Sequence, residues 1–114
     1  MNVSITLEEE FKRQAKHLIK KYRSFREDLV VLQDSLIANP FQGISLGGGV
    51  RKVRMAIASK GKGKSGSARV LTLVVMVSED ADVTLLTIYD KSEIGNVSDE
   101  YIKWLVEQHG KTTY

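Results

Sequence analysis

The chain has 114 residues, with 17 Lys and Arg side chains against 14 Asp and Glu, so its formal net charge is +3. This length is enough for one hydrophobic core and too short for two domains. The sequence contains no Cys, which excludes disulfide scaffolds, thiolate metal sites and cysteine nucleophiles. Residues 1–6 show no charged segment followed by an apolar one, and no apolar run approaches the ~20 residues that span a bilayer. We therefore expect a soluble, cytoplasmic domain over residues 1–114, with no membrane partner.

The positive charge is concentrated in two segments. Residues 1–78 hold 14 basic and 6 acidic side chains, whereas residues 79–114 hold 3 and 8, so the two parts carry net charges of +8 and −5. Residues 12–26 and residues 50–69 each contain seven cations and no acid. Such clusters indicate a polyanionic partner, with nucleic acid as the first candidate. For residues 12–26, a solvated helix face is an equally good interpretation.

Two helices are predicted in the first third of the chain. Residues 3–5 alternate like a short strand, and Thr6 with Glu9 forms a capping box that predicts a helix beginning there. An apolar stripe follows, made of Phe11, Ala15, Leu18, Ile19 and Tyr22, while Lys12, Lys16 and Lys20 step by four along another face. A second capping box, Ser24 with Glu27, opens a helix that Asn39–Pro40 ends. The short connection predicts an antiparallel helix hairpin.

The remainder of the chain predicts strands and a last helix. Residues 41–49 are rich in Gly and predict a loop, after which the period changes to two. In residues 50–57, Val53, Met55 and Ile57 should face the core, with Lys52 and Arg54 on the opposite face. The apolar run 69–77 predicts a central strand, residues 83–89 predict its neighbour, and a helix follows from residue 98 to residue 110. The order indicates an α+β fold, in which an N-terminal helix hairpin packs on a small antiparallel sheet with a C-terminal helix.

The strongest candidate site is the basic segment 50–69. If its two strands pair as a hairpin, Lys52, Arg54 and Arg69 lie on neighbouring strands within reach of one phosphate. Seven cations without an anion destabilise a purely structural protein by mutual repulsion, which favours a functional interpretation. Further phosphate contacts are expected from Arg51 and from three lysines in or beside the Gly/Ser-rich loop, namely Lys60, Lys62 and Lys64. Tyr89 is a candidate to stack on a base, and packing at the strand end is the alternative.

Several other chemistries are excluded or unsupported. Gly63-Lys64-Ser65 matches the end of a phosphate-binding P-loop, but Ala58 stands where the first glycine is required, and a strand follows instead of a helix. The only histidines, His17 and His109, lie far apart without a carboxylate spacing that suggests metal ligands. We expect neither a metal nor a cofactor.

Cleavage of RNA is the catalytic option that remains. RNA supplies its own nucleophile, the 2′-hydroxyl, so a protein needs to orient it, assist proton transfer and stabilise the charged phosphorane. Lys and Arg perform the last task directly. A lysine among other cations is expected to have a lowered pKa, which would make it a conceivable general base.

Residues 49–70, together with Asn39–Pro40, Gly43 and residues 89–93, resemble the HigB-like branch of the RelE/ParE toxin superfamily. The resemblance implies a small bacterial toxin that enters the ribosomal A site and cuts mRNA without a metal, leaving a 2′,3′-cyclic phosphate and a 5′-hydroxyl. By position, Lys52 and Arg54 match the basic strand that binds phosphate and acts on the nucleophile, and Arg69 matches a transition-state stabiliser. Lys91, with Tyr89, falls near the C-terminal basic and aromatic positions, although no second arginine and no closely following tyrosine are present.

The resemblance also implies partners. These are an antitoxin, commonly a helix-turn-helix protein, the mRNA, and ribosomal RNA, whose phosphates Lys12, Lys16 and Lys20 would contact. Two alternatives remain open: a non-enzymatic inhibitor of DNA gyrase, as in the ParE branch, and an RNA-binding module that does not cleave.

Overall fold

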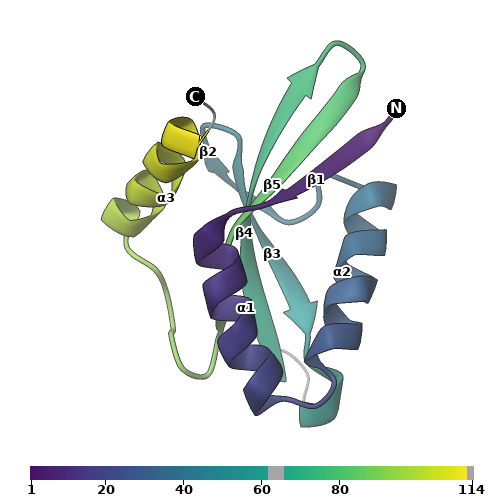
Figure 1. The fold of residues 1–114 in the computed structure, drawn as a ribbon, viewed down its shortest axis with the longest axis vertical. Helices are drawn as coiled ribbons and strands as arrows, with labels where there is room; N and C mark the ends of the chain where they lie inside the picture. The colour runs from purple at the N-terminus through teal and green to yellow at the C-terminus, as the bar shows by residue number, and fades with distance from the viewer. Residues whose placement is uncertain (62–65, 113–114) are drawn as a thin grey trace.

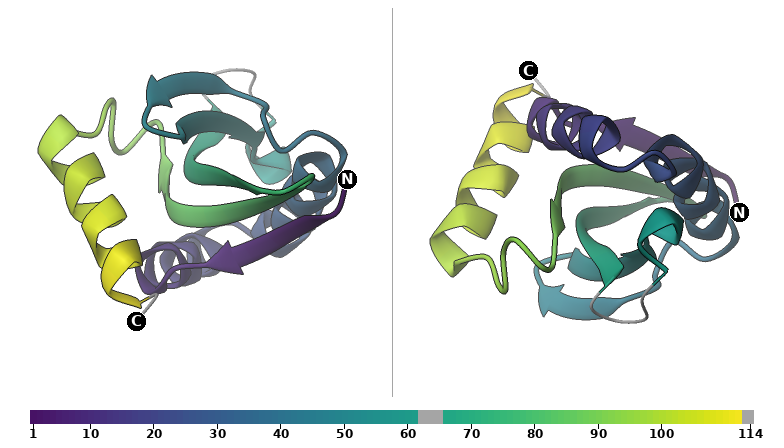
Figure 2. Two further views of the ribbon diagram at one scale, coloured as in Figure 1. Left: turned by 90° about the horizontal axis from the view of Figure 1, so that it is seen from above. Right: turned by 90° about the horizontal axis from the view of Figure 1, so that it is seen from below.

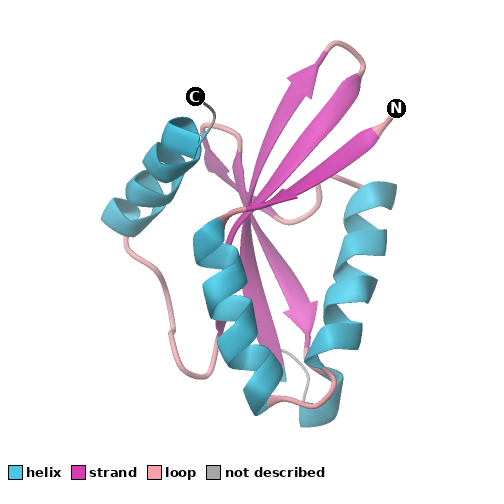
Figure 3. Cartoon of the chain, in the orientation of Figure 1, coloured by secondary structure: helices cyan, strands magenta, loops and turns pink. Residues whose placement is uncertain are grey.

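The computed structural model describes residues 1–61 and 66–112 as an α+β domain, which confirms the predicted fold class (Figures 1 and 3). In chain order the elements are β1 (Val3–Leu7), α1 (Glu9–Lys21), α2 (Phe25–Ala38), β2 (Ile44–Gly47), β3 (Val50–Ala56), the 3₁₀ turn η1 (Ala58–Lys60), β4 (Ser67–Val77), β5 (Asp80–Asp90) and α3 (Asp99–Thr112). The two N-terminal helices run in opposite directions, as their short connection predicts (Figure 1).

The strands form one sheet in the order β1-β5-β4-β3-β2. Neighbouring strands from β2 to β5 are antiparallel, as expected, but β1 pairs with β5 in parallel, from Val3 opposite Ala81 to Leu7 opposite Leu85. The sheet is therefore mixed. The first strand leads directly into α1, which continues along β5 from Leu85 at its start to Asp90 at its end. β1 therefore occupies the outer edge of β5 without a hairpin.

The main core lies between the helix hairpin and one face of the sheet (Figure 2). Phe11 and Leu18 of α1 and Leu36 of α2 are buried there. The inward positions predicted for β3 are confirmed, since Val53 and Met55 belong to the same cluster, as does Ile57 just beyond the strand. The period-two pattern of residues 50–57 is thus a consequence of this burial.

On the opposite face, α3 covers only part of the sheet. Leu105 of α3 packs against Leu71, Leu73 and Leu86 in a second, smaller cluster, which Val50 joins. Beyond this cluster, toward the end of β3, the side chain of Arg54 is exposed. The uncovered part of this face holds the candidate site.

Three local predictions need correction. Thr6 does not cap a helix: it pairs with Thr84 inside the sheet, and α1 begins at Glu9 after an N-cap residue, Glu8, that forms no side-chain capping bond. Pairing of β1 with β5 stabilises this segment more than a helix cap at Thr6 would, because it buries part of β1. Ser24 does precede α2, but its hydroxyl donates to Asp28 at 2.7 Å instead of capping the helix. The segment predicted as a loop contains β2, an exposed edge strand paired with β3.

Candidate phosphate-binding site

Three side chains form a row across three neighbouring strands, near the end of the sheet where β3 and β5 end and β4 begins. Arg54 of β3 stands directly opposite Arg69 of β4, and Arg69 stands directly opposite Tyr89 of β5. Lys52 precedes Arg54 by two residues and lies on the same face, opposite Leu71. The prediction that the hairpin brings Lys52, Arg54 and Arg69 onto neighbouring strands is confirmed.

The two arginines of this row have no acidic partner. Arg69 donates to the hydroxyl of Ser67 and to the carbonyl of Ala68, and neither Arg54 nor Arg69 forms an ion pair within residues 1–61 and 66–112. Like charges directly opposite each other on paired strands are destabilising. An anion bound between the guanidinium groups would remove that repulsion and complete their hydrogen bonding.

Tyr89 ends the row as a buried residue, only 4% exposed. Burial raises the pKa of its phenol, and the positive charge of Arg69 offsets part of that shift. The hydroxyl therefore stays protonated at neutral pH. Tyr89 packs at the strand end and is one of the residues that line two hollows beside β5.

Lys60 is held by contacts with other parts of the chain. Its ammonium group lies 2.9 Å from Asp90 and 3.0 Å from the hydroxyl of Ser92, and it stands over the ring of Tyr22. Burial by itself lowers the pKa of Lys60, but the bonds to Asp90 and Tyr22 raise it above the ordinary value. The lowered pKa that was expected of a lysine in this cluster is wrong for Lys60, which is held in its charged form.

Asp90 is the centre of this buried network. Its side chain is 0% exposed and accepts hydrogen bonds from the Tyr22 hydroxyl, from Lys60, and from the backbone and hydroxyl of Ser92. Burial alone would raise the pKa of this carboxyl, but these donors lower it well below its usual range. The network joins the end of α1, the turn η1 and the end of β5 directly behind the arginine row.

The other residues that the sequence predicts to bind or act on RNA lie in different parts of the structure. Arg51 donates to the carbonyls of Gln42 at 3.2 Å and Gly43 at 3.1 Å, so its guanidinium braces the segment before β2. Lys91 follows β5, and its backbone N–H donates to the carbonyl of Ser67, which places it at the same end of the sheet as the row. Lys62 and Lys64 lie outside the described residues.

The basic residues of α1 occupy a different surface. Lys12, Lys16 and Lys20 are exposed and line a hollow of about 410 Å³ between α1 and α2. Lys12 also lies 3.4 Å from Glu9. The helix hairpin covers the face of the sheet opposite to Arg54 and Arg69, so these three lysines lie away from the arginine row. Cations of the two basic segments come together at Tyr22, where both Lys21 and Lys60 stand over the ring.

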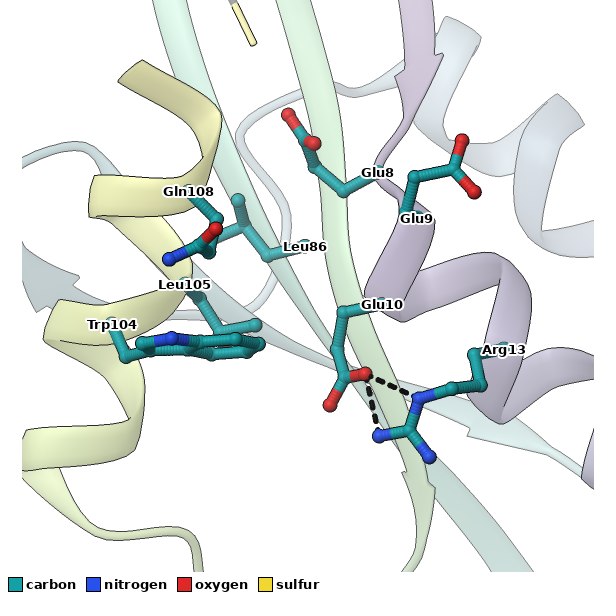
Figure 4. Close-up of a pocket in the computed structure, with 8 residues that line it drawn as sticks. All are labelled: Glu8, Glu9, Glu10, Arg13, Leu86, Trp104, Leu105 and Gln108. Carbon is teal, nitrogen blue, oxygen red and sulfur yellow. Dashed lines mark hydrogen bonds and ion pairs between the residues drawn. The ribbon is translucent and has the colours of Figure 1, made fainter. Parts of the chain in front are cut away.

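The histidines are separate from the row. His17 lies 3.8 Å from Glu93, and His109 contacts the carboxylate of Glu8. Within residues 1–61 and 66–112, no three His, Asp or Glu side chains are grouped so that they could hold a metal ion. A cavity of about 360 Å³ between α1 and α3 is lined by three carboxylates, those of Glu8, Glu9 and Glu10, which makes it unsuited to a polyanion (Figure 4).

The sequence does not predict Asp90, Tyr22 and Ser92 as partners of Lys60, because they lie about thirty positions or more from it along the chain. Their only sequence signal is the proximity of Asp90 to Tyr89, at the end of an apolar strand.

No known protein-family model matches the chain. Among the helices of the described residues, none combines the length and the hydropathy that a membrane span requires.

Proposed function

We propose that this protein is the toxin of a type II toxin–antitoxin system, a ribosome-dependent endoribonuclease that cleaves mRNA in the A site and inhibits translation. The observation that carries the proposal is the pair formed by Arg54 and Arg69, which stand directly opposite each other on paired strands. Arg54 is exposed, Arg69 is half-buried, and neither has an acidic partner in the described part of the chain. The resemblance of residues 49–70 to HigB-like toxins supports the choice of mRNA as the anion.

The proposed reaction needs only what RNA and these cations provide. The 2′-oxygen of one nucleotide attacks the adjacent phosphorus, the bond from phosphorus to the 5′-oxygen breaks, and the products are a 2′,3′-cyclic phosphate and a 5′-hydroxyl. Arg54 and Arg69 bind the non-bridging oxygens and stabilise the extra negative charge of the phosphorane. We assign Lys52 to the attacking 2′-oxygen, whose proton must leave, and Lys91 to the departing 5′-oxygen, which must gain one.

Partners follow from the distribution of charge. Lys12, Lys16 and Lys20 would contact ribosomal RNA phosphates, which positions the protein without reading sequence. A cognate antitoxin, proposed to be a helix-turn-helix protein, would block the arginine row. Association through phosphates should weaken steeply as the salt concentration rises.

Replacing Arg69 by Ala tests the proposal. In a bacterial cell-free translation reaction, the wild-type protein should cut mRNA within translated codons, and Arg69→Ala should lower the cleavage rate on the order of 10²–10³-fold, as expected when one donor to a developing oxyanion is lost. Lys103→Ala, which removes an exposed cation of α3 outside both basic segments, is the control and should cleave at the wild-type rate. Circular dichroism would establish that both variants are folded.

The same assay separates the alternatives. A folded Arg69→Ala protein that cleaves at the wild-type rate would contradict the assignment of this site. DNA damage in cells without RNA cuts would favour the gyrase inhibitor, and ribosome binding without cleavage would favour an RNA-binding module.

A further inference from the structure

The tip of the β4–β5 hairpin exposes apolar side chains. Val75, Met76 and Val77, the last residues of β4, are 46%, 47% and 56% exposed. Successive side chains of a strand point to opposite faces, so the sheet is uncovered on both faces here. Figure 1 shows this tip at one end of the long axis of the molecule. A run of exposed apolar side chains beside charged ones is typical of a surface that contacts another molecule.

The same tip is acidic, and we call residues 75–82 the acidic tip. Glu79, Asp80 and Asp82 are all exposed. Asp80 and Asp82 accept hydrogen bonds only from neutral donors near the N-terminus, a backbone N–H and a hydroxyl. In residues 1–61 and 66–112, none of the three carboxylates forms an ion pair. Their negative charge is therefore available to a cationic partner.

The hollow of about 410 Å³ between α1 and α2 has the complementary chemistry, and we call it the basic groove. Its apolar lining consists of Leu7, Phe11, Ala15, Ile19 and Leu29. Four cations complete the lining, namely Lys12, Lys16, Lys20 and Arg26, and no acidic side chain contributes to it. Lys12 lies 3.4 Å from a glutamate of its own helix, whereas the other three cations have no ion pair within the described residues.

The apolar surface continues beyond the basic groove on the outer side of α2. Val30 and Ile37 are 58% and 48% exposed and share one face of the helix with Arg26, by their spacing. A surface helix normally presents polar residues on the face opposite its buried stripe. Exposed branched apolar residues beside a groove rimmed by cations therefore indicate that another surface covers them.

The acidic tip and the basic groove belong to the same chain but lie apart. The helix connection next to Lys20 is at the opposite end of the long axis from the acidic tip (Figure 1). The tip of one molecule therefore does not reach the cations at that end of its own groove. Two molecules with their long axes antiparallel would bring each acidic tip to the basic groove of the other and keep like charges apart.

We propose that two copies of this chain form a dimer with two-fold symmetry, in which the acidic tip of each copy occupies the basic groove of the other. A two-fold axis makes the contact twice, which brings the buried area closer to the roughly 800 Å² per partner of a stable interface. The arginine row lies on the face of the sheet opposite to the helix hairpin, so the dimer leaves it uncovered. The inference does not depend on the proposed function, and the dimer must dissociate before the lysines of α1 can contact RNA.

The molar mass of the purified, nuclease-treated full chain tests the proposal. Sedimentation equilibrium should show a dimer in about 0.05 M salt and a monomer in about 0.5 M salt, because salt screens the charges of tip and groove. Two double variants reverse the charge of one surface each. Glu79→Lys/Asp80→Lys changes the acidic tip, and Lys16→Glu/Lys20→Glu changes the basic groove.

Each double variant should weaken association on the order of 10²-fold or more, because it places like charges against each other. An equal mixture of the two variants should form a dimer again, because every acidic surface then meets a basic one. Glu100→Lys/Glu107→Lys is the matched control: it changes the net charge as the tip variant does, but on exposed positions of α3, and should dimerise like the wild type. Circular dichroism would establish that all variants are folded.

A wild-type chain that is monomeric in low salt would overturn the inference. So would undiminished association of either double variant, or a mixture of the two that stays monomeric. A mass that keeps rising with concentration would indicate open head-to-tail chains and refute the two-fold arrangement. If a monomeric chain instead binds phosphatidylglycerol vesicles or poly-glutamate through Lys16 and Lys20, the groove has a different occupant and the second copy is excluded. None of these measurements involves RNA, so their outcome is independent of the cleavage assay.

Discussion

Replacing Asp90 by Asn should strongly destabilise the protein, because it leaves the ammonium of Lys60 without its counter-ion. The Asp90 side chain is 0% exposed and that of Lys60 is 14% exposed, so solvent cannot replace the lost interaction. Removing one partner of a buried ion pair costs about 3–5 kcal/mol. Asparagine keeps the shape and one acceptor oxygen, so we expect a loss of about 3 kcal/mol in the free energy of unfolding.

Urea denaturation followed by circular dichroism measures this loss, and the double variant Asp90→Asn/Lys60→Met provides its control. Methionine retains much of the aliphatic length of lysine and has no charge to leave unpaired, so the double variant should be more stable than Asp90→Asn alone. A loss below about 1 kcal/mol in Asp90→Asn, or a double variant less stable than the single one, would refute the assignment of Asp90 and Lys60 as a buried pair.

The same pair predicts how stability depends on pH. The pKa of Asp90 is lowered in the folded state, so the unfolded chain binds its proton first as the pH falls. The stability from Asp90 is therefore complete above its ordinary pKa of about 3.8 and decreases as the pH falls below that value. Asp90→Asn should lack this component of the acid dependence, so a wild-type acid profile in this variant would contradict the lowered pKa.

Two further changes test the framework around the site. Tyr101→Phe removes the bonds to Thr87 and Glu10 and should lower the free energy of unfolding by about 1–3 kcal/mol. Because burial raises the pKa of Tyr101 to about 12, an ultraviolet pH titration of the wild type should show a tyrosine ionising near pH 12 that this variant lacks. Gly43→Ala should cost about 2–4 kcal/mol, since Gly43 has φ +93° and an added Cβ would clash with the carbonyl of Lys52. Gly47→Ala, with φ +91° and open space around it, should cost only about 1–2 kcal/mol in the same urea measurement, so equal losses would exclude the clash.

Features set by local periodicity could be predicted from the sequence. The alternation of residues 50–57 placed Val53 and Met55 in the core and Lys52 and Arg54 on the other face because one side of β3 is buried and the other is not. Antiparallel pairing of β3 with β4 then brought Arg69 opposite Arg54. Most of the candidate site follows from these two regularities.

Features that depend on distant partners could not be predicted. β2 is exposed along its whole length, so burial imposes no alternation on it, and pairing with β3 alone makes it a strand. Thr6 has the local signature of a helix cap, but a place opposite Thr84 in β1 is available only in the folded sheet. Lys60 looked like one more loop cation because Asp90, its partner, is thirty positions away.

The fold separates the cations of residues 50–69 into two kinds. Lys60 and Arg51 are bound by groups of the protein itself and contribute to stability. Arg54 and Arg69 repel each other across paired strands and have no acidic partner in the described part of the chain. Arg69→Ala should therefore abolish most cleavage and change the free energy of unfolding by less than about 1 kcal/mol, because removal of the like-charge contact offsets the loss of the bonds to Ser67 and Ala68. If Arg69→Ala instead lowers both the free energy of unfolding and the cleavage rate, the arginine row stabilises the fold. Its unpaired charge would then no longer be evidence for a bound phosphate.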